Sequence, residues 1–244
     1  MAIIEFKNVS RRYGAVYALK AFDYSFRESE ITAVVGRSGS GKSTLLQLIN
    51  GLIRPSDGQV SVFGQPIDYD RVMALRRKIG YAVQGTGLFP HLTVAENIGL
   101  PARLVGWPES RRRQRVCELM ELVSLPAEFH SRYPHELSGG QQQRVGLCRA
   151  MMLDPDILLF DEPFGALDPI TRSDLHQEVL RLQALQPRTI VLVTHDMREA
   201  FKLATELLIL EDGQLVQAGR RETILQHPAT PFIRNLIHTQ LELS

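Results

Sequence analysis

One run of nine residues contains the residue types that bind phosphate: Gly36-Arg37-Ser38-Gly39-Ser40-Gly41-Lys42-Ser43-Thr44. Two glycines that enclose four residues, followed by Lys and a hydroxyl residue, form a phosphate-binding pattern. Glycines let backbone N–H groups turn toward phosphate oxygens, where a side chain would obstruct them. We expect Lys42 to reach the β- and γ-phosphates and Ser43 to offer its hydroxyl to Mg²⁺. The run predicts nucleoside triphosphate binding and leaves the use of that nucleotide open.

The segments around this run predict the strand and helix that position such a loop. Residues 31–35 are apolar and β-branched, as in a buried strand, and residues 44–50 have a helical pattern that Gly51 can end. The start of the helix adds partial positive charge beside the phosphates. A purely structural Gly/Ser turn is the alternative, and the flanking strand and helix disfavour it.

Two adjacent carboxylates, Asp161 and Glu162, follow a second apolar strand pattern. An acidic residue delivered by a strand beside a phosphate loop is how such NTPases hold Mg²⁺, so Asp161 is the candidate magnesium partner, through water. Glu162 can address a different atom, the attacking water, as general base. The alternative is an acidic pair that faces solvent.

Gln84 and His195 also follow predicted strands, at residues 79–83 and 189–194. The carboxyl ends of parallel strands line the ligand crevice of α/β proteins. We expect Gln84 to touch the metal and the water, and His195 to hydrogen-bond the γ-phosphate. A lone strand-end His is usually structural, however, and a lone Gln carries little information.

A second candidate anion site lies at Leu137-Ser138-Gly139-Gly140-Gln141. Ser138 is placed to cap a helix, with two glycines and a polar helix start after it, and helix N-termini bind anions. One phosphate chain does not need two such sites on one lobe, so this site is expected to serve a nucleotide bound to a second copy. A plain Ser-capped helix after a glycine turn is an equal alternative on these residues alone.

The remaining pattern predicts an α/β frame that carries a helical insertion. Strands are expected at residues 3–9 and 17–26, joined by a turn at 11–14, and a hairpin at 207–217. Tyr13 on that turn could stack on a base, although an exposed turn tyrosine usually has no such role.

The insertion is predicted to be helical from about residue 94 to 153. It contains an amphipathic helix at 108–123, with an arginine cluster that we interpret as a solvated face, and a helix at 141–153. Asp168-Pro169 starts a further helix, with an apolar stripe at Leu175, Val179, Leu182 and Leu185. Residues 85–92 are expected to form a loop with exposed apolar residues, and 238–244 a tail.

Composition sets broad limits. The chain has 244 residues, of which 44% are hydrophobic, and this is enough to build one large domain or two lobes. Its net charge is only +1, so no overall electrostatic field attracts nucleic acid. Cys117 and Cys148 lack metal spacing and predict a reduced, cytosolic chain with buried thiols. No apolar run approaches the roughly 20 residues that span a bilayer, and no signal-peptide pattern is present. Any membrane role is therefore expected to come through a partner.

With these residues placed, the chain resembles the ATP-binding cassette (ABC) family of transport ATPases over essentially its whole length. The phosphate loop, Gln84, the Leu-Ser-Gly-Gly-Gln signature, Asp161-Glu162, Ala166-Leu167-Asp168 and His195 match the family's motifs in order. The resemblance implies the ABC ATPase fold: a mostly parallel core sheet with an antiparallel β subdomain and an inserted helical subdomain. A single domain over 1–244 is expected, with residues 1–85 and 155–244 as the RecA-like core and β subdomain, and about 86–154 as the helical subdomain.

The resemblance also implies roles for individual residues. Two cassettes would pair in the ATP-bound state, and each ATP would lie between the phosphate loop of one and Ser138, Gly139, Gly140 and Gln141 of the other. Tyr13 would stack on adenine, Asp168 would lie at the dimer interface, and His195 would sense the γ-phosphate. Expected catalytic residues are Lys42, Gln84, Glu162 and His195, with Mg²⁺ held by Ser43, Gln84 and Asp161.

A narrower resemblance points to importers of osmoprotectant quaternary amines: glycine betaine, choline or carnitine. Its residues lie at 75–81, 87–91, 133–136 and 162–169. It implies transmembrane permease subunits, docked near residues 88–92 and the helical segment, a solute-binding protein, and a place on the cytoplasmic face of the inner membrane. Many members carry a C-terminal regulatory pair of modules, which is not expected here. Other solutes, export, or a soluble nucleic-acid-associated ATPase are the alternatives.

Overall fold

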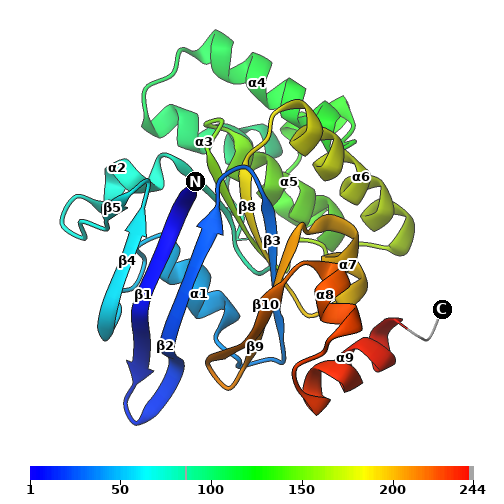
Figure 1. Ribbon diagram of the computed structural model, residues 1–244. Coiled ribbons are helices and arrows are strands. Elements are labelled where there is room, and N and C mark those ends of the chain that lie inside the picture. Colours follow the sequence, from blue (N-terminus) through cyan, green and yellow to red (C-terminus); the bar gives the residue numbers. More distant parts are fainter. Residues whose placement is uncertain (86, 242–244) are drawn as a thin grey trace. The chain divides into compact units, whose positions relative to one another are not determined.

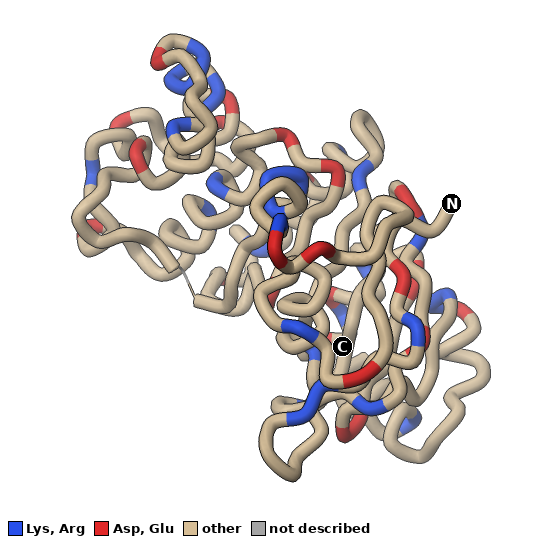
Figure 2. Tube along the Cα trace, turned by 90° about the vertical axis from the view of Figure 1, so that its left-hand side faces the viewer, with Lys and Arg blue, Asp and Glu red and all other residues tan. Residues whose placement is uncertain are grey.

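The computed structural model describes residues 1–85 and 87–241, which form two compact units (Figure 1). The first contains Met1–Arg76 and Pro187–Ser244, and the second contains Arg77–Gln186. Both charge signs are distributed along the trace in Figure 2, in agreement with the net charge of +1. None of the described helices is both long and apolar enough to cross a membrane.

An antiparallel sheet of the first unit has the order β2-β1-β4-β5. Its strands are β1 (Ala2–Tyr13), β2 (Val16–Arg27), β4 (Asp57–Val62) and β5 (Gln65–Pro66). Phe6, Phe22 and Phe26 pack on its buried face, the first two edge-to-face with ring centroids 5.1 Å apart. The turn predicted at 11–14 is wrong, because strand pairing continues to Tyr13 opposite Val16, and Gly14, with a φ of 59°, makes the turn.

The second sheet of the first unit has the order β10-β9-β3-β8. It comprises β3 (Ile31–Gly36), β8 (Thr189–Thr194), β9 (Glu206–Glu211) and β10 (Gln214–Gly219). β3 is parallel to both β8 and β9, and β3 and β8 are buried along their whole length. Because β3 and β8 are parallel neighbours, the loops that follow them leave the sheet at the same edge.

Helices of the first unit connect and cover these strands. They are α1 (Lys42–Ile49), α2 (Val72–Arg76), α7 (Met197–Leu203), α8 (Arg221–Gln226) and α9 (Pro231–Leu241). The tail predicted at 238–244 is wrong for residues 238–241, which complete α9, because Ile233 and Ile237 give this helix a buried face. The rest of the predicted tail, residues 242–244, lies outside the described residues.

The second unit contains two parallel strands and a group of helices. Its strands are β6 (Ile79–Ala82) and β7 (Ile157–Asp161). Its α-helices are α3 (Val94–Leu104), α4 (Glu109–Leu122), α5 (Gly139–Met151) and α6 (Pro169–Leu185), and two 3₁₀ helices lie at Ala127–Ser131 and Pro134–Glu136. α3, α4 and α5 pack against one another.

Helix boundaries in the second unit follow from capping groups. α5 begins at Gly139, earlier than predicted, because Ser138 accepts a hydrogen bond from the N–H of Gln141 and starts the helix directly after itself. In α3, Thr93 and Glu96 form a capping box: the Thr93 N–H donates to Glu96 Oε2 at 2.8 Å, and the Glu96 N–H donates to Thr93 Oγ1 at 3.2 Å.

Two burial predictions in the second unit are wrong. Cys117 is exposed, because it lies outside the buried stripe of α4, which consists of Val116, Leu119 and Met120. Cys148 is buried, its thiol donates to the carbonyl of Leu119, and burial raises its pKa. Leu185 is 69% exposed, because it ends α6. The apolar stripe of that helix is therefore buried at Leu175 and Val179 but not at its last residue.

Asn97 of α3 fixes the loop that precedes this helix. Its side chain is fully buried, and its Nδ2 donates to the carbonyls of Phe89, Leu92 and Thr93 at 3.1, 2.9 and 3.0 Å. Its Oδ1 accepts from the N–H of Phe89 at 2.8 Å. This amide therefore holds the second half of the loop predicted at 85–92, and Thr86 within that loop lies outside the described residues.

Replacing Asn97 by Ala leaves these backbone groups without their partner. We expect N97A to lower the free energy of unfolding by about 1–3 kcal/mol, the usual cost of unsatisfied buried polar groups. Urea titration measures this loss. Q114A, which removes an exposed contact between Gln114 and Glu118 within α4, is the control, and an equal effect of both substitutions would contradict the prediction.

Candidate nucleotide-binding site

Two positions in the loop between β3 and α1 require glycine. Gly41 is the N-cap of α1 with a φ of 100°, and a Cβ atom at this position would lie 2.2 Å from the carbonyl oxygen of Ala18. At Gly36 a Cβ atom would lie 2.2 Å from the carbonyl oxygen of Leu210. The backbones of neighbouring strands therefore pack directly against Gly36 and Gly41, and a larger residue would not fit at either position.

The side chains of this loop suit an anionic ligand. Lys42 is only 6% exposed, and its ammonium donates to the carbonyls of Gly36 and Arg37, both at 2.8 Å, so its charge lies inside the loop. Ser40 Oγ is buried and has no hydrogen-bond partner among residues 1–85 and 87–241. A buried cation and an unpartnered buried hydroxyl fit phosphate oxygens, which accept hydrogen bonds from both.

His195 follows β8 at the sheet edge that also carries the phosphate loop. Val35 of β3 pairs with Thr194 of β8, so the two loops start from adjacent positions. The side chain of His195 is exposed, and its carbonyl accepts from Gln240 Nε2 at 3.1 Å. The structure thus brings together the phosphate loop and His195, as expected from their places after strands.

Two other predicted ATP-binding residues of the first unit are Tyr13 and Arg37. Tyr13 ends β1, is 48% exposed, and has the Arg11 guanidinium 4.5 Å from its ring centroid. Arg37 places its guanidinium 5.1 Å from the ring centroid of Phe232 in α9. The exposed ring of Tyr13 suits stacking, whereas Arg37 has an aromatic partner within its own unit.

In the second unit, Gln84, Asp161 and Glu162 follow the parallel strands β6 and β7. Gln84 lies two residues beyond β6, and its Nε2 donates to Glu162 Oε2 at 3.5 Å. Asp161 is 4% exposed and ends β7, because Glu162 adopts a left-handed φ of 50°. Burial, and next the charge of Asp161, raise the pKa of Tyr81. Gln84 therefore contacts Glu162, and the Asp161 side chain is buried at the end of β7.

The N-terminus of α5 carries a capping box formed by Ser138 and Gln141. Ser138 Oγ accepts from the Gln141 N–H at 3.3 Å, and Gln141 Oε1 accepts from the Ser138 N–H at 2.9 Å. The Gln141 side chain is therefore engaged with its own helix. The Ser138 hydroxyl keeps its proton to donate, and the helix start leaves N–H groups for an anion.

Residues 166–168 lie against this helix start. Gln143 Oε1 accepts from the Ala166 N–H at 3.1 Å, and a Cβ atom on Gly140 would lie 3.0 Å from Leu167 Cδ2. Asp168 Oδ1 caps α6 by accepting from the Thr171 N–H at 3.0 Å, and the hydrogen bonds from Thr171 lower the pKa of Asp168. The predicted signature and interface residues are thus neighbours within the second unit.

Sequence reasoning missed Gln143, which holds the two segments together. It is 8% exposed, although it lies in the polar run Gln141-Gln142-Gln143, which predicts a solvated face. Successive residues of a helix point in different directions, so the three glutamines cannot all face solvent in the same way. The position of Gln143, five residues after the Ser138 cap, was the only sequence signal that could separate it from its two neighbours.

The predicted magnesium ligands are chemically suitable. Ser43, Gln84 and Asp161 offer a hydroxyl, an amide and a carboxylate oxygen, and hard oxygen donors are what Mg²⁺ takes. Among the described residues there is no group of three or more His, Cys, Asp and Glu that could hold a metal by itself. The assignment stays a prediction.

Comparisons with known proteins identify the family to which this chain belongs. The ABC transporter family matches residues 19–165. The glycine betaine uptake system ATP-binding protein of Escherichia coli (strain K12) is 48% identical over 95% of this chain and 75% of its own length. The glycine betaine/carnitine/choline transport ATP-binding protein of Bacillus subtilis (strain 168) is 46% identical over 96% of this chain, which spans 62% of that relative's length.

Solved structures are similar over most of the chain. A dimeric post-hydrolysis state of an ATP-binding cassette with ADP and Pi has a TM-score of 0.84 and 35% identity, and covers 89% of this chain and 98% of its own. The chain therefore belongs to the ABC transporter family, of which it carries the ATP-binding domain. The predicted family and fold class are confirmed.

A methyl group at Gly41 should destroy the phosphate loop. We expect G41A to weaken ATP binding at least about tenfold, because the added Cβ would overlap the Ala18 carbonyl. Titration with a fluorescent ATP analogue measures this affinity. G64A is the matched control, since Gly64 also has a positive φ, of 74°, but a Cβ atom added there would have no neighbour within 4 Å. Wild-type affinity in G41A would contradict the assignment.

Proposed function

We propose that this chain is the ATP-hydrolysing subunit that powers an ABC importer for osmoprotectant quaternary amines such as glycine betaine, choline or carnitine. The observation that carries the ATPase part is the buried ammonium of Lys42 inside a glycine loop that ends a buried strand. The solute part is supported by relatives at 46–48% identity that are named for these solutes.

The phosphates of ATP would bind the backbone of residues 36–44, with Lys42 moving its ammonium from the loop carbonyls to the β- and γ-phosphates. Tyr13 would stack on adenine. Ser43, Gln84 and Asp161 would hold Mg²⁺, which neutralises developing phosphate charge when bound. Glu162 would take a proton from the attacking water, and His195 would donate a hydrogen bond to the γ-phosphate.

The capped start of α5 would act on ATP bound to a second copy. Ser138, Gly139, Gly140 and Gln141 offer a hydroxyl and N–H groups, and Asp168 beside them would lie at the interface between cassettes. The dimeric cassette with ADP and Pi supports this pairing. ATP affinity for the paired state would drive closure, because a ligand shifts an equilibrium by its differential affinity for the two states.

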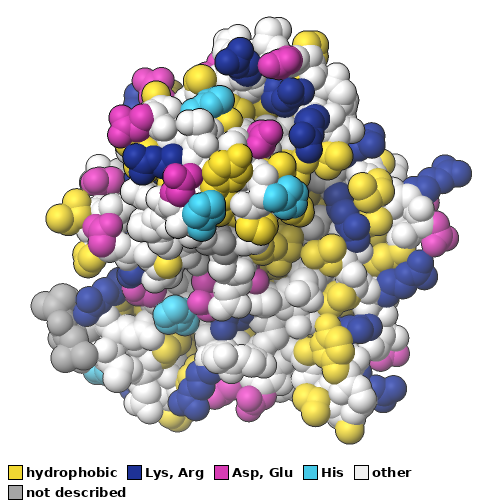
Figure 3. Space-filling view, turned by 180° about the vertical axis from the view of Figure 1, so that it is seen from behind, with side chains coloured by type: hydrophobic (Ala, Val, Ile, Leu, Met, Phe, Trp, Pro, Cys, Tyr) yellow, Lys and Arg dark blue, Asp and Glu magenta, His cyan; other side chains and the backbone are white. Residues whose placement is uncertain are grey.

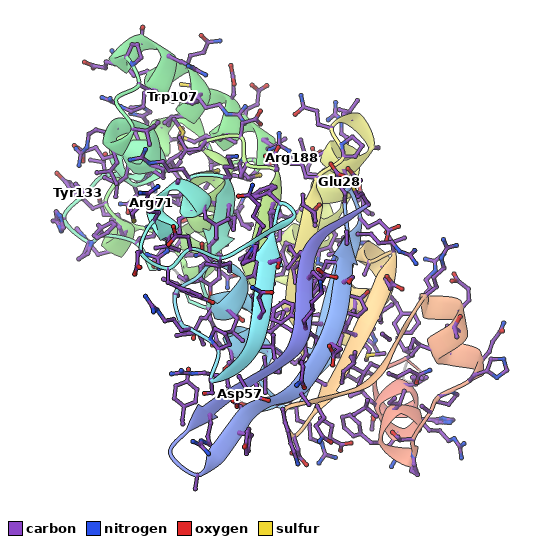
Figure 4. The ribbon with its side chains drawn as sticks, turned by 60° about the vertical axis from the view of Figure 1, so that its left-hand side comes forward. Glu28, Asp57, Arg71, Trp107, Tyr133 and Arg188 are labelled. Carbon is purple, nitrogen blue, oxygen red and sulfur yellow. The ribbon has the colours of Figure 1, made fainter. Side chains whose placement is uncertain are left out.

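The partners would be transmembrane permease subunits and a solute-binding protein, and the chain would then lie on the cytoplasmic face of the inner membrane. Phe89 is 43% exposed and packs edge-on against His91, and Tyr133 is 41% exposed and stacks on His135. Figure 4 labels Tyr133 at the edge of the second unit, and Figure 3 shows surface histidines beside hydrophobic side chains. Such an apolar surface suits a permease segment, and it lies in the proposed helical subdomain, residues 86–154.

The second candidate is an importer for another solute. A sulfate/thiosulfate import ATP-binding protein of Thermosynechococcus vestitus is 42% identical over 96% of this chain and 69% of its own length, so the ATPase alone does not decide the cargo. Purifying the chain with its membrane partner and titrating the associated binding protein with glycine betaine, choline, carnitine and sulfate tests this. Binding of a quaternary amine supports the proposal, and binding of sulfate alone contradicts its solute part. DNA- or RNA-stimulated hydrolysis would contradict the transport function.

Replacing Glu162 by Gln removes the proposed base without changing the size of the side chain. We expect E162Q to bind ATP and to form a stable ATP-dependent dimer, while hydrolysis falls about 10²–10⁴-fold. Phosphate release and gel filtration with ATP measure both effects. E121Q, on the exposed side of α4, is the control. Turnover close to wild type would exclude Glu162 as the base.

Replacing Lys42 by Ala removes the buried ammonium. We expect K42A to lower ATP affinity or hydrolysis about tenfold or more, because charge-assisted hydrogen bonds to the phosphates are lost. Nucleotide titration and phosphate release measure the loss. K7A removes an exposed lysine paired with Glu5 and should retain wild-type values. Unchanged activity in K42A would contradict the phosphate-loop assignment.

A further inference from the structure

The side-chain amide of Gln240 in α9 forms two hydrogen bonds with the loop that carries His195. Its Nε2 donates to the carbonyl oxygen of His195 at 3.1 Å, and its Oε1 accepts from the N–H of Met197 at 2.7 Å. One planar amide therefore bridges two backbone groups on either side of Asp196. This bridge limits rotation of the backbone from which the His195 side chain projects.

The bridge completes the N-terminus of α7. Asp196 caps this helix, and its Oδ1 accepts from the N–H groups of Arg198 and Glu199 at 2.8 and 3.4 Å. The N–H of Met197, the first residue of the helix, has no intrahelical acceptor, since the first N–H groups of a helix never have one. Gln240 supplies that acceptor from another element.

Gln240 is itself held in place. Arg198 Nε donates to the carbonyl oxygen of Gln240 at 2.6 Å, and α9 packs on the protein through Ile233 and Ile237, which are 0% and 9% exposed. α9 contacts α7 and is drawn in red in Figure 1. Its position is therefore fixed by packing as well as by the amide bridge.

The same helix also contacts the phosphate loop. The ring of Phe232 lies 5.1 Å from the Arg37 guanidinium, within the range of a cation–π interaction. α9 thus touches both loops that leave the parallel neighbours β3 and β8 at one edge of the sheet. A displacement of α9 would change its contacts with the Arg37 side chain and with the His195 backbone.

We propose that Gln240 is a positioning residue for ATP hydrolysis: it sets the backbone of the His195 loop so that the imidazole reaches the γ-phosphate. This rests on the proposed function, in which His195 contacts that phosphate. Gln240 acts through His195 and does not touch ATP, so its loss should lower turnover and leave ATP binding by the phosphate loop nearly unchanged.

The test compares two glutamines that make equivalent bridges. Gln217 Nε2 donates to the carbonyl oxygen of His227 at 2.9 Å, and its Oε1 accepts from the N–H of Ala229 at 2.9 Å, in a part of the first unit that carries no site residue. Q240A and Q217A thus remove the same kind of contact. We expect Q240A to lower kcat about fivefold or more, with the KM for ATP within about twofold of wild type, and Q217A to change neither.

A substitution of Gln240 by Glu separates the two halves of the bridge. Its carboxylate still accepts from the Met197 N–H but has no proton for the His195 carbonyl, so Q240E should lower kcat as Q240A does. Thermal unfolding with and without ATP shows that each variant is folded. Wild-type kcat in Q240A or Q240E would overturn the proposal, and so would loss of ATP binding or of the fold in both, which would make Gln240 merely structural.

The variant H195A reports on the proposed function alone, since unchanged turnover in it would remove His195 from the mechanism. In the H195A background, Q240A should cause no further loss of kcat, because residues that act through one another are not additive. An equal loss from Q240A in both backgrounds would show that Gln240 acts elsewhere, and would overturn this inference while leaving the role of His195 intact.

Discussion

The burial of one positive charge is the constraint on which the phosphate loop depends. The Lys42 ammonium is taken out of water at the start of α1 and is compensated by two backbone carbonyls of its own loop. A buried ammonium is stable only where its protons have acceptors. This requirement explains why the loop must wrap tightly, and why Gly36 and Gly41 lie where neighbouring backbone leaves no space for a Cβ atom.

Amide side chains anchor several loops whose backbone groups are not paired within a helix or sheet. Asn97 holds residues 89–93, Gln143 holds Ala166, and Gln240 holds His195 and Met197. Each amide has both donors and acceptors, so it can replace a missing backbone partner on either side of a turn. Loops that bear predicted site residues, or lie beside them, are thereby ordered without being part of a sheet or helix.

Helix caps also fix the segments that carry the sequence motifs. Ser138, Asp168 and Asp196 each end an extended segment and satisfy N–H groups of the helix that follows. A cap fixes where a helix starts and therefore where its positive end lies. In α5 the Ser138 cap fixes that end, and Gln143 ties the same helix to Ala166, so capping and anchoring together hold the Ser-Gly-Gly segment in one arrangement.

The sequence alone determined the local chemistry: the glycine–lysine loop after a buried strand, the carboxylates after another, the capped helices, and the family to which these motifs belong. Such features are decided by residues close together in the chain, whose backbone preferences and hydrogen bonds are local. Only the tertiary structure decided that the polar Gln143 is buried, that Cys117 is exposed, and that residues 238–241 are helical. It also decided that Gln240 forms a hydrogen bond with the backbone of His195, which is 45 residues away in the chain. These outcomes depend on which surfaces pack together, because a side chain's burial and partners are set by distant segments that no local pattern specifies.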